Sequence, residues 1–385
     1  MKEKFLRELA DIQTGPFGSQ LHKEDYVADG TPIVTVEHLG NKMFSEQNLP
    51  RVSNTDKNRL KKYVLKQGDI VFSRVGSVDR CSCVDQKHDG WMFSGRCLRV
   101  RPTSEIDSEY LYYYFCLEET KQFVRNIAVG ATMPSINTKL LGEVVVTFPE
   151  LEQQKRISGI LSAIDSKIEV NQKINDNLQQ QAMALYAEMF LNSSNNDVTS
   201  GTLSDIAVIT MGQSQSGSSY NEDGVGEVFY QGRAEFGFRF PKRRLFTTEP
   251  KRMAVAGDVL LSVRAPVGDL NMAYERCCIG RGLGAIHSKT GHSSFVLYTM
   301  FALRSQLNVF NGEGTVFGSI NRDALNAIPI DVPLVTQIDQ FEAVAHPIDE
   351  LIRTNYEENC RLEAIRNSLL PKLMSGEIDV SAIRL

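Results

Sequence analysis

Apolar residues recur about every 3.5 positions over a long stretch in the middle of the chain, between Pro149 and Phe190. A sustained repeat of this period is typical of a helix that packs in a coiled coil. Ten successive inward positions fit the repeat, and eight of them are apolar: Ile157, Leu161, Ile164, Ile168, Asn171, Asn175, Leu178, Ala182, Leu185 and Met189. The pattern therefore predicts one long helix with a narrow apolar seam.

A second copy of this helix lies 184 residues further on, between Pro333 and Leu373. Asparagine again occupies the fifth and sixth inward positions, which are Phe341, Ala345, Ile348, Ile352, Asn355, Asn359, Leu362, Arg366, Leu369 and Leu373. Pro347 and Pro371 each remove a backbone donor, so we expect the second helix to kink or fray near its two ends. The helix is duplicated together with its polar interruption.

The duplicated asparagines bear on how the two helices meet. Antiparallel packing places Asn171 opposite Asn359 and Asn175 opposite Asn355, whereas parallel packing exchanges the partners. Chain connectivity favours the antiparallel pair, because the first helix leads into a second globular domain and the second helix leaves it. We interpret the four asparagines as residues that fix the register of the coiled coil. The alternative is that they are tolerated polar residues on a partly hydrated seam.

The globular segments are repeated as well. Three stretches of the first resemble three of the second: Leu9–Gly15 and Leu203–Gly212, Gly68–Ser73 and Gly257–Ser262, and Gly130–Asn137 and Gly314–Asn321. Turns containing Gly and Asp separate short β-type runs, here at 33–36, 69–73, 97–100 and 144–148. The predicted fold is α+β, with two mixed α/β domains and two long helices packed as an antiparallel coiled coil around a pseudo-two-fold repeat.

The expected boundaries follow from this repeat. Residues 1–148 form the first domain and 149–192 the first spacer helix, 193–332 the second domain, and 333–385 the second spacer helix with a tail. Each domain also contains an aromatic-rich helical pattern, Tyr110–Val124 and Phe295–Val309. Its rings could stack on bases, but aromatic helices next to a sheet usually belong to the core, and we predict a core role.

Composition and cysteine content indicate a globular protein in a reducing compartment. The chain has 385 residues and seven cysteines, an odd number without a regular framework. Residues Met1–Asp11 lack the apolar core of a secretory signal, and no apolar run is long enough to span a membrane. We therefore expect a cytoplasmic protein without a membrane partner.

Charge is divided unevenly along the chain. The net charge is −5, yet residues 51–101 contain twelve Lys/Arg against five Asp, and residues 233–252 contain seven basic against two acidic residues. The helical segments 150–192 and 331–379 are acidic, with four basic residues each against six and ten acidic ones. Positive charge thus lies in the globular domains, where it suits a polyanion such as DNA.

No catalytic pattern is found in the sequence. It contains no Gly-x4-Gly-Lys-Ser/Thr phosphate loop, no cofactor loop of an amino-methyltransferase and no acidic metal cluster typical of a nuclease. Cys81, Cys83, Cys97 and His88 raise the alternative of a zinc site. Because paired C-x2-C half-sites are missing, structural cysteines on strands are favoured. We predict no cofactor and no metal in this chain.

The remaining candidates are recognition residues. A Gly-Pro-Phe-Gly-Ser-Gln loop at 15–20 can present amides and a ring to DNA, although an ordinary turn is an equal alternative. Arginine reads guanine and neutralises phosphate. It follows matched strands in both repeats, and it alternates with Phe in residues 233–244. The bland alternative is a solvated basic face. The predicted DNA-binding residues are Phe17, Ser19, Gln20, Arg74, Ser77, Arg80, Thr132, Gln213, Arg233, Arg239, Lys242, Arg243, Arg264 and Thr315. Arg74 and Arg264 are expected at equivalent places.

The whole pattern resembles the specificity subunit of a type I restriction-modification enzyme. The resemblance rests on the Gly-x-Thr/Val-x-x-Ser-Ile-Asn loops, on the start of the first helix with Pro149, Gln153 and Ile157, and on Ile164-Asp165. It extends to the end of the second helix, Leu369-Leu-Pro-Lys-Leu-Met-Ser-Gly376. In the second copy the start has Phe341 in place of isoleucine.

The resemblance implies that each domain reads one half of a bipartite site in double-stranded DNA, while the paired helices set the spacing and bind partners. Two modification subunits would bring S-adenosylmethionine, and restriction subunits would bring ATP, Mg²⁺ and cleavage. The alternatives are a stand-alone DNA-modifying enzyme or nuclease with an unrecognised site, and a protein-only scaffold. DNA binding through several Lys/Arg contacts weakens steeply with salt, whereas association of a scaffold need not.

Overall fold

The computed structural model describes residues 1–16, 20–40, 42–192, 198–311 and 318–381. The chain divides into two compact units. The first contains Met1–Glu169 and Glu358–Leu385, and the second contains Val170–Glu357. Each unit therefore combines one globular domain with part of both long helices.

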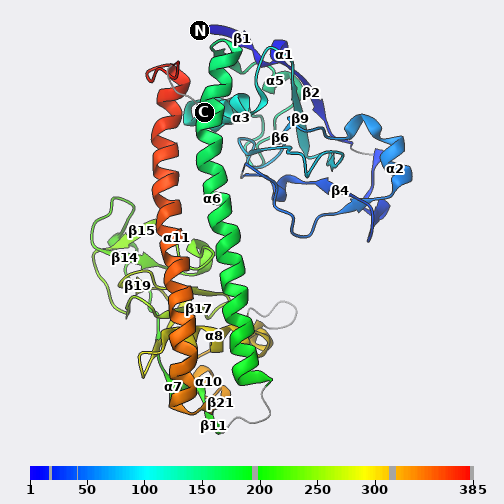
Figure 1. Cartoon of the computed structure of the whole chain (residues 1–385). Coiled ribbons are helices and arrows are strands. Elements are labelled where there is room, and N and C mark those ends of the chain that lie inside the picture. Colours follow the sequence, from blue (N-terminus) through cyan, green and yellow to red (C-terminus); the bar gives the residue numbers. More distant parts are fainter. Residues whose placement is uncertain (17–19, 41, 193–197, 312–317, 382–385) are drawn as a thin grey trace. The chain divides into compact units, whose positions relative to one another are not determined.

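The two long helices are α6 (Leu151–Tyr186) and α11 (Val335–Ser375), which Figure 1 shows in green and in orange to red. A π-helical turn, Ala187–Leu191, follows α6. The apolar seam lies where the 3.5-residue repeat predicts it, since Leu161, Ala182, Phe341 and Ile352 are fully buried. Helix α11 is continuous through both of its prolines, so the expected interruption does not break it.

The helices pack antiparallel within each unit. In the second unit the Asn355 side-chain amide donates to Asn175 Oδ1 at 2.8 Å, which is the antiparallel partner. In the first unit Arg366 of α11 donates to Asp165 of α6 at 2.7 Å. From the first pair to the second, the position on α6 moves back from 175 to 165 while the position on α11 moves forward from 355 to 366, as antiparallel packing requires. All four seam asparagines are buried.

The first unit has two small sheets and two hydrophobic cores. The central sheet has the order β2-β9-β6-β7 and is antiparallel throughout. Its strands are β2 (Ala10–Thr14), β9 (Cys97–Pro102), β6 (Ile70–Ser73) and β7 (Cys81–Cys83). The second sheet has the order β3-β5-β4-β8, from β3 (Tyr26–Val27), β5 (Arg51–Val52), β4 (Thr31–Val34) and β8 (Met92–Phe93).

Short helices and a ribbon complete this unit. Strands β1 (Lys2–Phe5) and β10 (Val145–Phe148) pair antiparallel, just before α6 begins. The helices are α1 (Leu6–Leu9), α2 (Asn54–Arg59), α3 (Ser108–Cys116), α4 (Glu118–Ile127) and α5 (Thr138–Leu141). Four of the five aromatic side chains of α3 are buried in the core, as predicted, and Tyr114 is partly buried against it. The single predicted helix is divided, however, because Leu117 adopts an extended conformation between α3 and α4.

The second unit repeats this architecture. Its central sheet has the order β12-β20-β17-β18, from β12 (Ala207–Met211), β20 (Leu283–Ser288), β17 (Val259–Ser262) and β18 (Leu270–Met272). The second sheet, β13-β15-β14-β19-β16, consists of β13 (Tyr220–Asn221), β15 (Leu245–Thr247), β14 (Glu227–Tyr230), β19 (Cys277–Ile279) and β16 (Met253–Ala254). Strands β11 (Val198–Thr202) and β21 (Pro329–Pro333) form the ribbon. The helices are α7 (Leu203–Ile206), α8 (Ser293–Ala302), α9 (Arg304–Asn308) and α10 (Arg322–Asn326).

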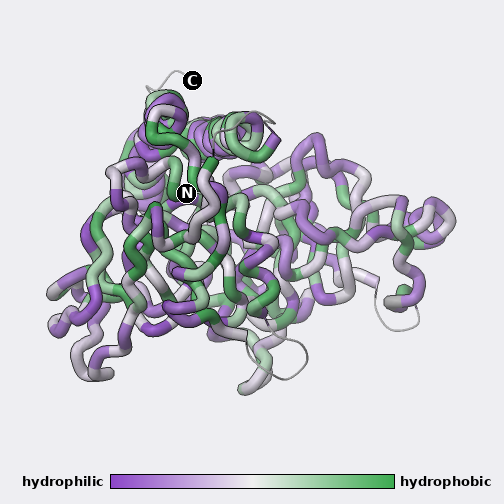
Figure 2. The backbone as a smooth tube through the Cα atoms, turned by 90° about the horizontal axis from the view of Figure 1, so that it is seen from below, coloured by the Kyte–Doolittle hydropathy of each residue, from purple (hydrophilic) through white to green (hydrophobic). Residues whose placement is uncertain are grey.

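Residues near the two ends of the described chain lie close together within the first unit. A Cβ built on Gly376 would lie 2.8 Å from Met1 Cε, and Val380 is buried in the core of the first unit. The hydropathy colouring in Figure 2 shows hydrophobic and hydrophilic stretches alternating along the backbone. Within the described ranges, no helix combines the length and apolar character needed to cross a membrane.

Candidate nucleic-acid interface

Three loops meet at one end of the central sheet in the first unit. The backbone N–H of Arg74, just after β6, donates to Arg96 O at 2.8 Å, and Ile136 N donates to Arg74 O at 2.9 Å. The Ser73 hydroxyl closes the turn by donating to Val75 O at 2.8 Å. The exit of β6, the loop before β9 and the Gly130–Asn137 loop therefore form one connected surface. We call it the first loop cluster.

The same junction is built in the second unit. Val263 N donates to Gly282 O at 3.0 Å, and Ile320 N donates to Val263 O at 3.1 Å. The Ser262 hydroxyl donates to Arg264 O at 3.0 Å. The exit of β17, the loop before β20 and the loop that ends at Asn321 make this second loop cluster.

These bonds correct the predicted equivalence of Arg74 and Arg264. Val263 makes the backbone bonds that Arg74 makes, so Arg264 occupies the place of Val75. Two isolated bridges agree, because Val75 pairs with Ser135 and Arg264 pairs with Ser319. Neighbouring residues of an extended chain point to opposite sides. The two arginines are therefore one position out of register.

Glycine is required where the first loop of each domain passes the sheet. A Cβ on Gly15 would lie 2.1 Å from Ser94 O, and one on Gly212 would lie 2.1 Å from Gly280 O. This close approach brings Gly15 next to the loop before β9, which is part of the first loop cluster. The predicted contacts Phe17 and Ser19 lie outside the described residues, as does Thr315.

The predicted polar contacts differ in availability. Ser77, Thr132 and Gln213 are exposed. Gln20 is engaged within the domain, because Tyr63 OH donates to its Oε1 at 2.6 Å. The described part of the chain thus leaves small polar groups at both clusters that can meet a ligand.

The arginines of the clusters are also held differently. Arg74 is half-buried and donates to Gly95 O at 3.1 Å, while the exposed Arg80 donates to Leu39 O. Arg264 is exposed. The exposed guanidinium groups of Arg80 and Arg264 carry several N–H donors, which can reach phosphate or a base edge. These two side chains can therefore act in recognition.

Two further arginines lie at the clusters and were not predicted from the sequence. Arg96 and Arg281 are exposed in the loops before β9 and β20, directly at the two junctions. The only sequence signal is their place next to glycine in Gly95-Arg96 and Gly280-Arg281-Gly282. Without the backbone pairing, nothing in the sequence connects them to the exits of β6 and β17.

The basic run at 233–244 is largely balanced by acids of its own unit. Arg233 pairs with Asp269, and Arg243 pairs with Glu275. Arg244 pairs with Glu222 at 3.2 Å and with Glu235 at 2.6 Å. The Lys242 side chain is exposed. This segment is less positive than its sequence indicates.

Arg239 is not available to bind DNA, which corrects its prediction as a contact. Its side chain is buried, with Nη1 2.6 Å from Asp349 Oδ1 and Nη2 3.3 Å from Tyr298 OH. Burial opposes the charged form, but Asp349 and Tyr298 outweigh it, so the pKa of Arg239 is raised. The neighbouring Phe240 is also buried and packs against Tyr356 of α11. Arg239 and Phe240 therefore attach the domain to the long helix.

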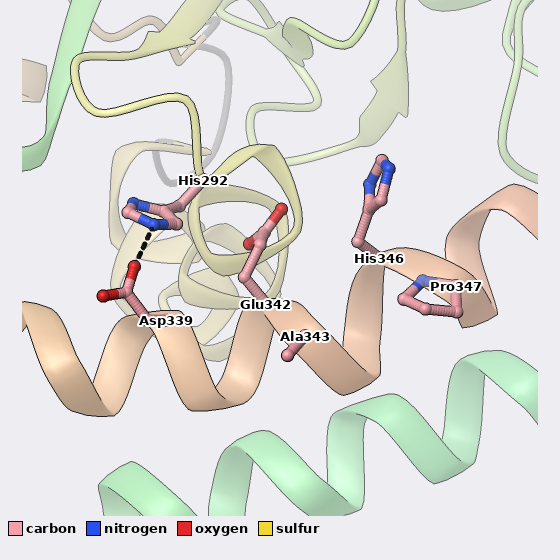
Figure 3. Close-up of a pocket in the computed structure, with 6 residues that line it drawn as sticks. All are labelled: His292, Asp339, Glu342, Ala343, His346 and Pro347. Carbon is pink, nitrogen blue, oxygen red and sulfur yellow. Dashed lines mark hydrogen bonds and ion pairs between the residues drawn. The ribbon is translucent and has the colours of Figure 1, made fainter.

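A hollow of about 350 Å³ lies where α8 meets α11. Figure 3 shows His292 and Asp339 facing each other, and their Nε2 and Oδ1 atoms are 2.8 Å apart. Both oxygens of Glu342 accept from the first backbone amides of α8, Ser294 at 3.1 Å and Phe295 at 3.0 Å. Among the described residues no group of three His, Cys, Asp or Glu side chains could hold a metal ion. The polar residues that line the hollow therefore hold the start of α8 on α11.

The comparisons with known proteins agree on one family. The model of the type I restriction modification DNA specificity domain matches residues 1–180. The putative type I restriction enzyme MjaX specificity subunit of Methanocaldococcus jannaschii is 29% identical, over 97% of this chain and 93% of its own length. The MjaIX specificity subunit of the same organism is 20% identical, over 74% of this chain and 72% of its own length.

A solved structure shares the fold. The S subunit of the type I restriction-modification system from M. genitalium aligns with a TM-score of 0.56 at 17% identity, covering 97% of this chain and 95% of that one. The fold described above is thus shared with that S subunit. Residues 1–180 thus match the type I restriction modification DNA specificity domain, and over nearly its full length the chain is similar to a type I restriction enzyme specificity subunit.

Proposed function

We propose that this chain recognises a bipartite site in double-stranded DNA, with one loop cluster reading each half-site. The observation that carries the proposal is the duplication of one loop junction, with the same backbone bonds at Arg74 and at Val263. Each junction presents an exposed arginine next to it, Arg96 in the first and Arg281 in the second. A reader that is built twice suits a site with two halves.

The functional division that we propose follows the repeat. Residues 1–148 and 193–332 are the two target-recognition domains, and 149–192 and 333–385 are the spacer helices with the tail. As a specificity subunit the chain contributes recognition, while chemistry belongs to other subunits of its system. We propose that the acidic helices dock two modification subunits, which would bring S-adenosylmethionine, and that restriction subunits would bring ATP and Mg²⁺ to a cytoplasmic complex.

The proposal is tested by mutating one cluster at a time. Arg264→Ala and Arg281→Ala should relax or weaken recognition of a single half-site, and Arg74→Ala and Arg96→Ala should act on the other. Loss of an arginine that reads a base costs ~1–3 kcal/mol at that position, whereas loss of a phosphate contact weakens all sequences alike and lowers the salt slope by about 1. Selection of duplexes from a random pool, repeated at several salt concentrations, separates these effects.

A matched control is available in the second domain. Arg276 is exposed and lies 3.6 Å from Glu227, before β19. Arg276→Ala should leave both half-sites unchanged. Variants of the second cluster that alter both half-sites together, or none, would contradict the assignment of one reader to each domain.

A further inference from the structure

A tyrosine on the aromatic helix of each domain is hydrogen-bonded to an aspartate on a long helix. Tyr113 OH of α3 donates to Asp165 Oδ2 of α6 at 2.5 Å, and Tyr298 OH of α8 donates to Asp349 Oδ1 of α11 at 2.8 Å. Both tyrosines are 1% exposed. The two aspartates are 184 positions apart, so this contact is part of the duplication.

In each unit a basic side chain lies next to this contact. It comes from the segment that connects two strands of that unit's second sheet. Cys83 N donates to Lys42 O at 2.7 Å, and Met272 N donates to Arg239 O at 2.8 Å, so Lys42 and Arg239 are structural equivalents. Lys42 Nζ lies 5.3 Å from the centre of the Tyr113 ring. The Arg239 guanidinium carbon lies 5.7 Å from the centre of the Tyr298 ring.

The cations also reach the long helices. Lys42 donates to Ser162 of α6 at 2.7 Å and lies 3.2 Å from Glu109 of α3. Arg239 binds Asp349 of α11 at 2.6 Å and Gln179 of α6 at 3.1 Å. Each anchor, defined as the tyrosine, the aspartate and the cation, therefore ties the second sheet, the aromatic helix and the long helix together.

The negative charge of the aspartate is balanced by a different residue in each anchor. In the first unit Asp165 receives its positive partner from the other long helix, through Arg366 at 2.7 Å. In the second unit Arg239 of the domain itself supplies the charge. The tyrosine–aspartate contact is present in both units, although the aspartate has a different positive partner in each. The contact, rather than any one ion pair, is therefore the common element.

We infer that these anchors are positioning elements, which fix the angle of each recognition domain on its long helix and so set the preferred gap between the half-sites. The inference rests on the proposed function. The anchors lie at the long helices, and the arginines that would contact DNA lie in the loop clusters. Loosening an anchor should therefore change how strictly the gap is measured, while the bases read by each domain stay the same.

The test uses the full chain with Tyr113→Phe and Tyr298→Phe, which remove one hydroxyl and keep the buried ring. Tyr110→Phe is the matched control, because Tyr110 is buried on the same helix and its hydroxyl donates to Thr147 O at 3.0 Å instead of to α6. Binding is measured to duplexes with both half-sites fixed and the gap changed one base pair at a time. The half-sites and the gap come from selection with the parent chain.

Loss of one hydrogen bond should reduce the preference for the parent gap over its neighbours by about 2- to 10-fold in each anchor variant. Preferences at each base of the half-sites should be unchanged, and Tyr110→Phe should keep the parent preference. Unchanged discrimination in both anchor variants, or an equal loss in the control, would overturn the inference. Failure of the parent chain to select two half-sites would instead overturn the proposed function.

Discussion

At the scale of single residues, arginines with similar sequence surroundings have opposite roles. Arg239 is 3% exposed and bound to Asp349, whereas Arg264 is exposed at a loop cluster. Both were predicted to contact DNA, because each lies in a basic or strand-terminal pattern. The sequence does not show that Asp349, 110 positions away, is the partner of Arg239. Local charge therefore predicts a basic domain but not which charges face a ligand.

Removal of Arg239 should be costly for stability. Arg239→Ala leaves the buried Asp349 carboxylate without its cation, which typically destabilises by ~3–5 kcal/mol. Arg233→Ala is the control, because Arg233 is half exposed in its pair with Asp269 and such pairs contribute ~0–1 kcal/mol. Chemical denaturation measures both losses. Equal, small losses would show that the Arg239 pair is not a stabilising contact of the domain.

At the scale of elements, the long helices were the most predictable part of the fold. Their apolar seam and the antiparallel partner of Asn175 followed from periodicity and chain connectivity. The role of Arg366 did not follow from the sequence. It occupies the position that the apolar Ala182 has in the first copy, and it binds Asp165 across the seam. The division between α3 and α4 was also missed, because one extended residue, Leu117, leaves the apolar periodicity intact.

The asparagine pair should behave as one unit. Asn175→Leu alone leaves the buried Asn355 amide without its acceptor, which should lower the free energy of unfolding by ~1–3 kcal/mol. Asn355→Leu should lower it in the same way. With both replaced, the seam is apolar on both sides and the loss should largely disappear. A double-mutant cycle by denaturation measures this coupling. Additive losses in the double variant would mean that the two side chains do not depend on each other.

Among the elements, the candidate site was less predictable than the fold. The β6 and β17 exits and the Ser-Ile-Asn loops were recognised as repeated stretches. Their junction with the loops at Arg96 and Arg281 is made by backbone hydrogen bonds between distant segments, which no local pattern encodes. The register between Arg74 and Arg264 is fixed by those same bonds.

At the scale of the whole molecule, residues near the two ends of the described chain lie close together in the first unit. Met1 approaches Gly376, and Arg156 donates to Val380 O at 3.4 Å, so the tail packs on the domain where the chain begins. A permutant that joins the termini and opens between Asn192 and Val198 should fold and bind the parent DNA site. A permutant opened inside α6 at Asp176 is the control and should be destabilised. Circular dichroism and duplex binding measure both.

A permutant opened between Asn192 and Val198 that folds but no longer recognises DNA would contradict this arrangement of the chain ends. Its failure to fold, together with normal folding of the Asp176 permutant, would do the same. The repeat itself was predictable from the sequence, because residues 184 positions apart match along both helices. The closing contacts at Gly376 and Val380 involve no repeated sequence, and only the structure reveals them.

If two domains read separate half-sites, the length of the helices should set the distance between those half-sites. Adding seven residues to each of α6 and α11 keeps the seam in phase and lengthens each by roughly 10 Å, or about three base pairs. The added base pairs also rotate one half-site by on the order of 100°, so affinity should fall. Selection of duplexes from a random pool, with the parent and the lengthened chain, measures this most directly. We predict two unchanged half-sites with a gap longer by about three base pairs. A single continuous site, or altered half-sites with an unchanged gap, would contradict the account.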